Sequence, residues 1–66
     1  MLAYEVKDMT CGHCASTITK AVKDADRGAK LTIDLARHRV EVEPAEAEAA
    51  EIEDAIREAG YTPVPA

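Results

Sequence analysis

The six residues Met9–Cys14 read MTCGHC and hold both cysteines of the chain. Before them, Leu2, Tyr4 and Val6 alternate with small or charged residues, which is typical of a strand with one buried face. After them, apolar residues recur every three or four positions, which is helical spacing. The two thiols therefore lie in a loop between a strand and a helix, with the second cysteine at or near the helix start. Such a position favours the thiolate, because the amide hydrogens and dipole of a helix N-terminus are positive.

The rest of the chain repeats these two patterns. Leu31, Ile33 and Leu35 alternate with polar residues, as do Val40 and Val42, whereas the alanine- and glutamate-rich segment near the C-terminus has helical spacing. The predicted elements are a strand over 2–7, a helix over 13–25, strands over 30–35 and 39–43, a helix over 45–59 and a short strand over 61–64.

Glycines and prolines mark the predicted boundaries. Gly28 is available for a left-handed turn after the first helix, and Gly60 for a cap on the second. Pro44 stops a strand and suits the first turn of a helix. Pro63 and Pro65 are tolerable only at the edge or end of a sheet, so the last strand is expected there.

The element order βαββαβ predicts an α+β fold of the ferredoxin-like type, with two helices on one face of a four-stranded antiparallel sheet. The right-handed crossover rule leaves few other arrangements. In this one, strands one and two run parallel, with strand three between them. The loop after strand one, the turn between strands two and three and the loop before strand four then share one end of the molecule. Cys11, Cys14, His38 and Tyr61 all belong to that end. One domain is expected over residues 1–66.

Composition narrows the classes of function. The chain has 66 residues, a net charge of −5 and no tryptophan or phenylalanine. Nucleic acid is not an expected partner, because phosphate contacts need clustered Lys and Arg. The sequence has no apolar run of transmembrane length and no signal-peptide pattern at its start, so no membrane insertion and a cytoplasmic location are expected. In a reducing compartment, a cysteine pair indicates metal binding or redox catalysis rather than a structural disulfide.

The number of ligands distinguishes between the candidate metals. Thiolates select soft ions such as Cu(I) and Zn(II). The loop supplies two sulfurs, from Cys11 and Cys14, and at most one local imidazole, from His13. A structural zinc site normally has four protein ligands, whereas Cu(I) tolerates two in a linear arrangement. The loop therefore predicts a Cu(I) site.

With its M-x-C-x-x-C loop in a βαββαβ chain, the sequence resembles the heavy-metal-associated domains. These include small bacterial copper chaperones and the N-terminal domains of copper-transporting P-type ATPases. The resemblance implies that Cys11 and Cys14 are the metal ligands and that Met9 anchors the loop. Tyr61, directly after Gly60, matches the aromatic residue that bacterial members place near the metal. The implied function is non-enzymatic delivery of Cu(I) by thiolate exchange, with the soluble domain of a copper-transporting P-type ATPase as acceptor and a copper-bridged homodimer as a further form.

The remaining residues of this end have supporting roles in this interpretation. His13 is expected to face solvent and to tune the thiolates, and Tyr61 to shield the site or bond near a sulfur. His38 lies between two arginines and is interpreted as a solvated surface residue, with ligation in a metal-bridged dimer as the alternative. The bases Lys7, Lys20, Lys23 and Arg27 and the acids of the second predicted helix suggest a polarised surface that steers partners.

Three alternatives stay open at this stage. Cys-Gly-His-Cys is also the active-site tetrapeptide of protein disulfide isomerases, but a thioredoxin-like enzyme needs a longer chain, usually a Trp before the motif and a cis-proline loop. Zinc or mercury could replace copper as the cargo; Asp8 lies two residues too early for the zinc-transporting branch, whereas Thr10 fits the Cu(I) branch. The chain could also be a domain of a transport ATPase, although a start at Met1 and an end just after strand four favour a free-standing protein.

Overall fold

The strands and helices follow the predicted order. The computed structural model describes residues 2–66; Met1, the start that favoured a free-standing protein, lies outside them. The elements are β1 (Leu2–Glu5), α1 (Gly12–Ala25), β2 (Lys30–Asp34), β3 (Arg39–Glu43), α2 (Ala49–Glu58) and β4 (Val64–Pro65).

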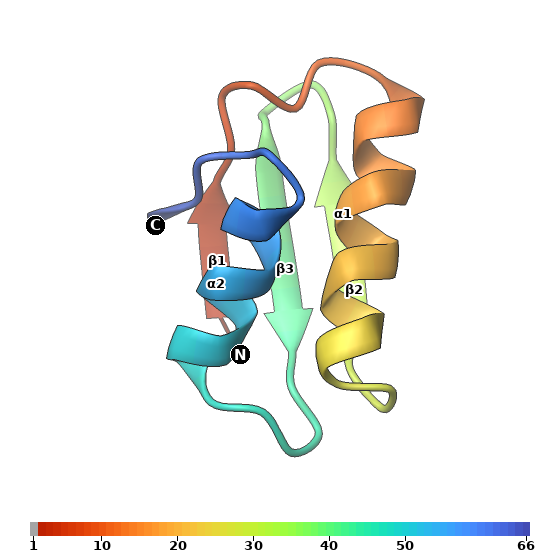
Figure 1. Cartoon of the computed structure of the whole chain (residues 1–66). Coiled ribbons are helices and arrows are strands. Elements are labelled where there is room, and N and C mark those ends of the chain that lie inside the picture. The colour runs from red at the N-terminus through yellow and green to blue at the C-terminus, as the bar shows by residue number, and fades with distance from the viewer. Residues whose placement is uncertain (1) are drawn as a thin grey trace.

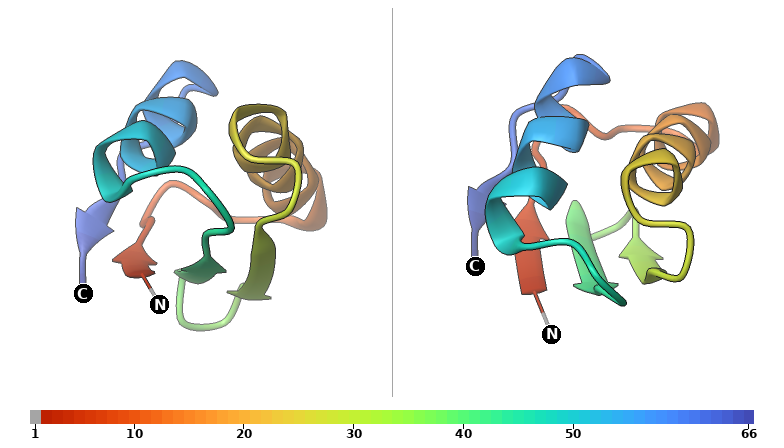
Figure 2. Two further views of the ribbon diagram at one scale, coloured as in Figure 1. Left: turned by 90° about the horizontal axis from the view of Figure 1, so that it is seen from below. Right: turned by 60° about the horizontal axis from the view of Figure 1, so that its bottom comes forward.

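The four strands form one antiparallel sheet in the order β2-β3-β1-β4. Both helices cover the same face of this sheet, as the views along the strands show (Figure 2). The predicted ferredoxin-like arrangement is therefore confirmed, with β3 between the parallel strands β1 and β2. β4 lies at an edge of the sheet. Its proline has no N–H to donate, and an edge strand tolerates this because it pairs with only one neighbour.

The core lies between the sheet and the helices. The register places Tyr4 opposite Val40 and Leu2 opposite Val42, so alternate residues of neighbouring strands share the inner face. Ile18 and Val22 of α1 and Ile52 and Ile56 of α2 pack on that face, at the predicted helical spacing, and all four are fully buried. Leu35 was expected to continue the inner face of β2, but it is 38% exposed. The strand ends one residue earlier, because the Asp34 carboxylate accepts the Arg37 N–H at 3.2 Å and starts the turn.

The predicted start of the second helix at residue 45 is wrong, because α2 begins at Ala49. The backbone N–H groups of Ala45, Glu46 and Ala47 all donate to Oδ2 of Asp26, at 2.8–3.0 Å. Asp26 is 6% exposed and is the one buried charged residue within residues 2–66. Because these three N–H groups all point at one carboxylate of another segment, the backbone bends around it and does not continue as a helix. Pro44 therefore ends β3 without starting a helix.

The two helix ends differ in their use of glycine. Gly60 follows α2 with φ of +99°, and the N–H groups of Gly60 and Tyr61 donate to the carbonyls of Arg57 and Ile56. This is the Schellman arrangement, so the predicted cap is confirmed. Gly28 does not adopt the predicted left-handed conformation. It is small for another reason: a Cβ at Gly28 would lie 2.8 Å from the Cβ of Ala45.

This close approach gives a testable difference between two glycines. Gly28→Ala is expected to lower the free energy of unfolding by about 1–2 kcal/mol, the usual cost of forcing an extra methyl group into a packed site. Gly12→Ala is the matched control, because a Cβ at Gly12 would extend into open space and the φ of this residue is ordinary. Urea unfolding of the two variants checks this; equal stabilities would contradict the close packing of Gly28 on Ala45.

Candidate metal site

The dithiol loop, which we define as residues 6–14, runs from the end of β1 through the first turn of α1 and crosses one end of the molecule (Figure 1). The β2–β3 turn and the segment from α2 to β4 lie at the same end, as the sequence predicts. Cys11, Cys14, His38 and Tyr61 thus come from three separate chain segments that the topology brings together. Within residues 2–66, no helix combines the length and apolar character that crossing a bilayer requires.

The two cysteines occupy the first turn of α1. Cys11 is the N-cap residue, with extended backbone angles, and Cys14 lies three positions later. This is the spacing at which an N-cap side chain and a third-position side chain face each other in a capping box. The two Sγ atoms are 3.3 Å apart, and both cysteines are free thiols. Cys11 is exposed, whereas Cys14 is half-buried and packs against the core.

The surroundings of Cys14 favour its thiolate. A hydrogen bond from the Tyr61 hydroxyl, followed by one from the Thr10 backbone and one from the Cys11 side chain, lowers the pKa of Cys14 to about 6. The same hydrogen bond, followed by burial, raises the pKa of Tyr61 above its ordinary value. The first turn of α1, which lies entirely within residues 2–66, has no acidic side chain whose negative charge would disfavour the thiolate. Cys14 is therefore largely ionised at neutral pH.

The loop is anchored below the thiols. Met9 is fully buried in the core, while Thr10 beyond it is exposed. Gly12 needs no special backbone angles, because it lies in the helix with an ordinary φ. This conformation therefore gives no backbone reason for a glycine at this position.

The two histidines behave differently. His13 is exposed, as expected. The interpretation of His38 as a solvated residue is wrong: it is half-buried, and its Nδ1 lies 2.8 Å from the carbonyl oxygen of Met9. Sequence reasoning missed this contact because its partners are 29 residues apart. It also missed Asp8, whose Oδ1 accepts the Thr62 N–H at 3.3 Å and joins the loop to the segment before β4.

The donor set available to a metal is small. Within residues 2–66, no cluster of three or more His, Cys, Asp or Glu side chains is arranged to hold an ion. The arrangement therefore offers a pair of sulfurs, one of them exposed, to a soft ion of low coordination number.

Tyr61→Phe is expected to raise the pKa of Cys14 from about 6 toward its ordinary value of 9.0, because the variant keeps the ring and loses the donating hydroxyl. At neutral pH less of the sulfur is then ionised. A pH titration of thiolate ultraviolet absorbance measures the midpoint, and Tyr4→Phe, which alters the other tyrosine, is the control. An unchanged midpoint in Tyr61→Phe would show that the hydroxyl does not stabilise the thiolate.

The fold and the site together define a small ferredoxin-like domain with a surface dithiol loop at one end. Residues 3–62 match the family model described as heavy-metal-associated domain. The chain belongs to this family.

Named relatives share both the fold and much of the sequence. A protein of Helicobacter felis named COP-associated protein is 46% identical over 59 residues, which cover 85% of this chain and 86% of the relative. A solved structure described as a gold binding protein is 35% identical over the full length of both chains, with a TM-score of 0.92. A trimeric form of the copper chaperone Atx1 from Synechocystis PCC6803 is 30% identical, covers 96% of this chain and 98% of its own, and has a TM-score of 0.90.

Proposed function

We propose that this chain is a cytoplasmic metallochaperone that binds Cu(I) between Cys11 and Cys14. The observation that carries the proposal is the pair of free thiols 3.3 Å apart at a helix N-terminus, one exposed and one with a pKa of about 6. Two thiolates and one Cu⁺ leave a net charge of −1, which the positive end of α1 offsets. The relatives described as copper-chaperone and gold-binding proteins support a soft cargo metal.

Transfer, rather than catalysis, is the proposed activity. A partner thiolate attacks the bound ion to give a three-coordinate intermediate, and one of the original sulfurs then leaves. Exposure of Cys11 gives the partner an open side from which to attack. The proposed acceptor is the soluble metal-binding domain of a copper-transporting P-type ATPase, and a copper-bridged homodimer uses the same exchange between two copies.

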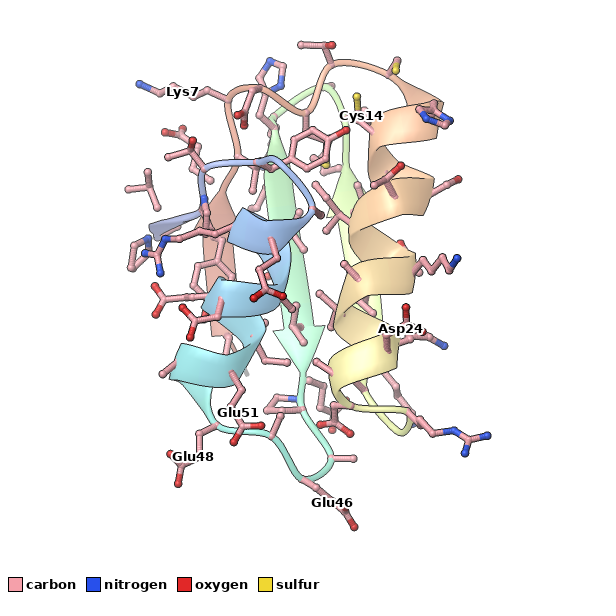
Figure 3. The ribbon with its side chains drawn as sticks, in the orientation of Figure 1. Lys7, Cys14, Asp24, Glu46, Glu48 and Glu51 are labelled. Carbon is pink, nitrogen blue, oxygen red and sulfur yellow. The ribbon has the colours of Figure 1, made fainter. Side chains whose placement is uncertain are left out.

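Charge is distributed so that a partner can approach the dithiol end. Glu46, Glu48 and Glu51 lie at the far end of the molecule from Cys14, whereas Lys7, a residue of the loop, projects outward at the Cys14 end (Figure 3). With a net charge of −5, the molecule repels other acidic proteins most strongly at that far end. This protein is therefore oriented with Cys11 and Cys14 toward an acidic partner.

Direct transfer is tested against spontaneous release. Protein loaded with one equivalent of Cu(I) is mixed, without oxygen, with a purified apo metal-binding domain of a copper-transporting ATPase. Exchange is expected to be faster than loss of Cu(I) from the same protein to a non-thiol chelator. The reason is that a thiolate of the acceptor binds the ion before a thiolate of the donor dissociates from it. Equal rates would contradict ligand exchange and leave only passive binding.

A further inference from the structure

We propose that His38 is a positioning residue for the dithiol loop, acting on Cys11 and Cys14 through the backbone of Met9. Its effect on copper release rests on the proposed function. The contacts that define it belong to the protein alone and can be tested without metal.

His38 contacts both ends of the turn that leads from β1 into the loop. Its carbonyl oxygen accepts the Val6 N–H at 2.7 Å, and its Nδ1 lies 2.8 Å from the Met9 carbonyl oxygen. The Met9 N–H in turn donates to the Val6 carbonyl at 3.1 Å. A carbonyl oxygen only accepts hydrogen bonds, so Nδ1 must carry a proton for this contact. One residue of the β2–β3 turn therefore fixes the whole segment from Val6 to Met9.

The backbone of His38 indicates that its side chain matters. Its φ of +54° lies in the left-handed region, and within residues 2–66 it is the one non-glycine residue with a positive φ. Glycine adopts this conformation without steric cost, whereas a residue with a Cβ does not. Histidine is nevertheless among the residues enriched there. The hydrogen bond to Met9 offsets this strain, and a glycine could not make it.

Little of the loop remains free once Met9 is fixed. The Met9 side chain is fully buried, its carbonyl is held by His38, and α1 begins at Gly12. Only Thr10 and Cys11 lie between these two fixed points. The position of the Cys11 sulfur relative to that of Cys14 therefore depends on where His38 holds the Met9 carbonyl.

This dependence matters because the sulfurs have to move when an ion binds. Zinc–thiolate bonds are about 2.3 Å long, and two bonds of that length on either side of a linearly coordinated ion would set the sulfurs roughly 4.6 Å apart. They are 3.3 Å apart here. With Met9 held, the loop opens only through Thr10 and Cys11, and it returns when the ion leaves. His38 thereby restricts the geometries through which Cu(I) is lost.

The first test uses the metal-free protein. Long-range ¹H–¹⁵N correlation spectra of the imidazole rings distinguish the two neutral tautomers. We expect His38 to be fixed as the Nδ1–H tautomer, unlike exposed His13 in the same spectrum. A neutral His38 protonated on Nε2 would overturn the proposal. This test uses the unmodified protein, so it does not depend on whether a variant folds.

The second test compares two variants. His38→Gly keeps a residue that adopts a positive φ without strain, and it removes the ring that contacts Met9. Ile52→Val truncates a fully buried side chain of α2 and serves as the control for a general loss of stability. Cu(I) release to a chelator is expected to be about tenfold faster in His38→Gly, the scale of losing a partner that orients a metal ligand. The amide hydrogens of Thr10 and Cys11 are expected to exchange faster in that variant alone.

The outcomes separate this proposal from the proposed function. Equal release rates and equal amide exchange in His38→Gly and Ile52→Val would overturn the positioning role. If the unmodified protein failed to bind Cu(I), the proposed function would be contradicted, while the tautomer and the exchange of the Thr10 and Cys11 amides would still decide the role of His38.

Discussion

Cys11→Ser and Cys14→Ser are each expected to abolish tight Cu(I) binding while the protein remains folded. A serine hydroxyl is a hard, neutral ligand at neutral pH and does not replace a thiolate for a soft ion. The remaining single sulfur leaves the ion with one ligand. The loss of affinity should therefore exceed the roughly 10–100-fold that follows from removing a residue that merely orients a ligand.

The fold should survive because neither sulfur fills the core. Cys11 is exposed, and Cys14 contacts the core without being fully buried. Competition with a chromophoric Cu(I) chelator measures affinity, and circular dichroism of the metal-free variants measures folding. Ser16→Ala, an exposed change further along α1, is the matched control and should bind like the unmodified protein. Tight binding by the double variant Cys11→Ser/Cys14→Ser would refute the site.

Asp26→Asn is expected to cause the largest loss of stability among single polar substitutions in this chain. Oδ2 of Asp26 accepts three backbone N–H groups, and Oδ1 accepts the Gly28 N–H at 3.3 Å. An amide removes the charge and, in either orientation, sets an NH₂ group against backbone donors. The melting temperature should fall by on the order of 10 °C.

The matched control is Asp24→Asn, the same chemical change two residues earlier at an exposed position. Its melting temperature should stay close to that of the unmodified protein. The experiment also reports on the start of α2, because amide exchange at Ala45, Glu46 and Ala47 should accelerate in Asp26→Asn. Slow exchange at these amides together with an unchanged melting temperature would show that the carboxylate does not hold the segment.

The lowered pKa of Asp26 also predicts how the stability of the fold changes with pH. Hydrogen bonds from the backbone of Ala47, Glu46 and Ala45 lower the pKa of Asp26 below its ordinary value of 3.8. A group with a lowered pKa in the folded state stabilises the fold above its unfolded pKa, and the contribution is lost as pH falls through the folded pKa. Stability should therefore decrease below about pH 4. Asp26→Asn should lack this part of the acid dependence.

The architecture could be predicted because it depends on local pattern. Alternation placed Tyr4 and Val6, and Val40 and Val42, on the inner face, and the connection rules then left few other sheet orders. The same reasoning placed the two thiols between a strand and a helix, with Cys14 at or near the helix start, because strand spacing gives way to helical spacing there. These features need no information about contacts between distant residues.

Contacts between distant residues account for what could not be predicted. Residues 45–48 consist of alanine and glutamate, which favour helix, but three of their amides bind Asp26, which lies 19–21 residues away in the sequence. His38 looks like a solvated turn residue in sequence, and only the fold brings Met9 to it. In both cases one side chain satisfies backbone groups of another segment, and neither partner shows a local signal for this.

The most direct test of Cu(I) binding by the dithiol loop is an anaerobic titration of the reduced protein with Cu(I), in competition with a chromophoric chelator, with a parallel titration with Zn(II). We expect tight binding of one Cu(I) per chain and much weaker binding of Zn(II), because the dithiol loop supplies two sulfurs and Zn(II) needs more ligands. Tighter binding of Zn(II), or no binding of either ion by thiols that cycle readily with a dithiol oxidant, would contradict a copper site.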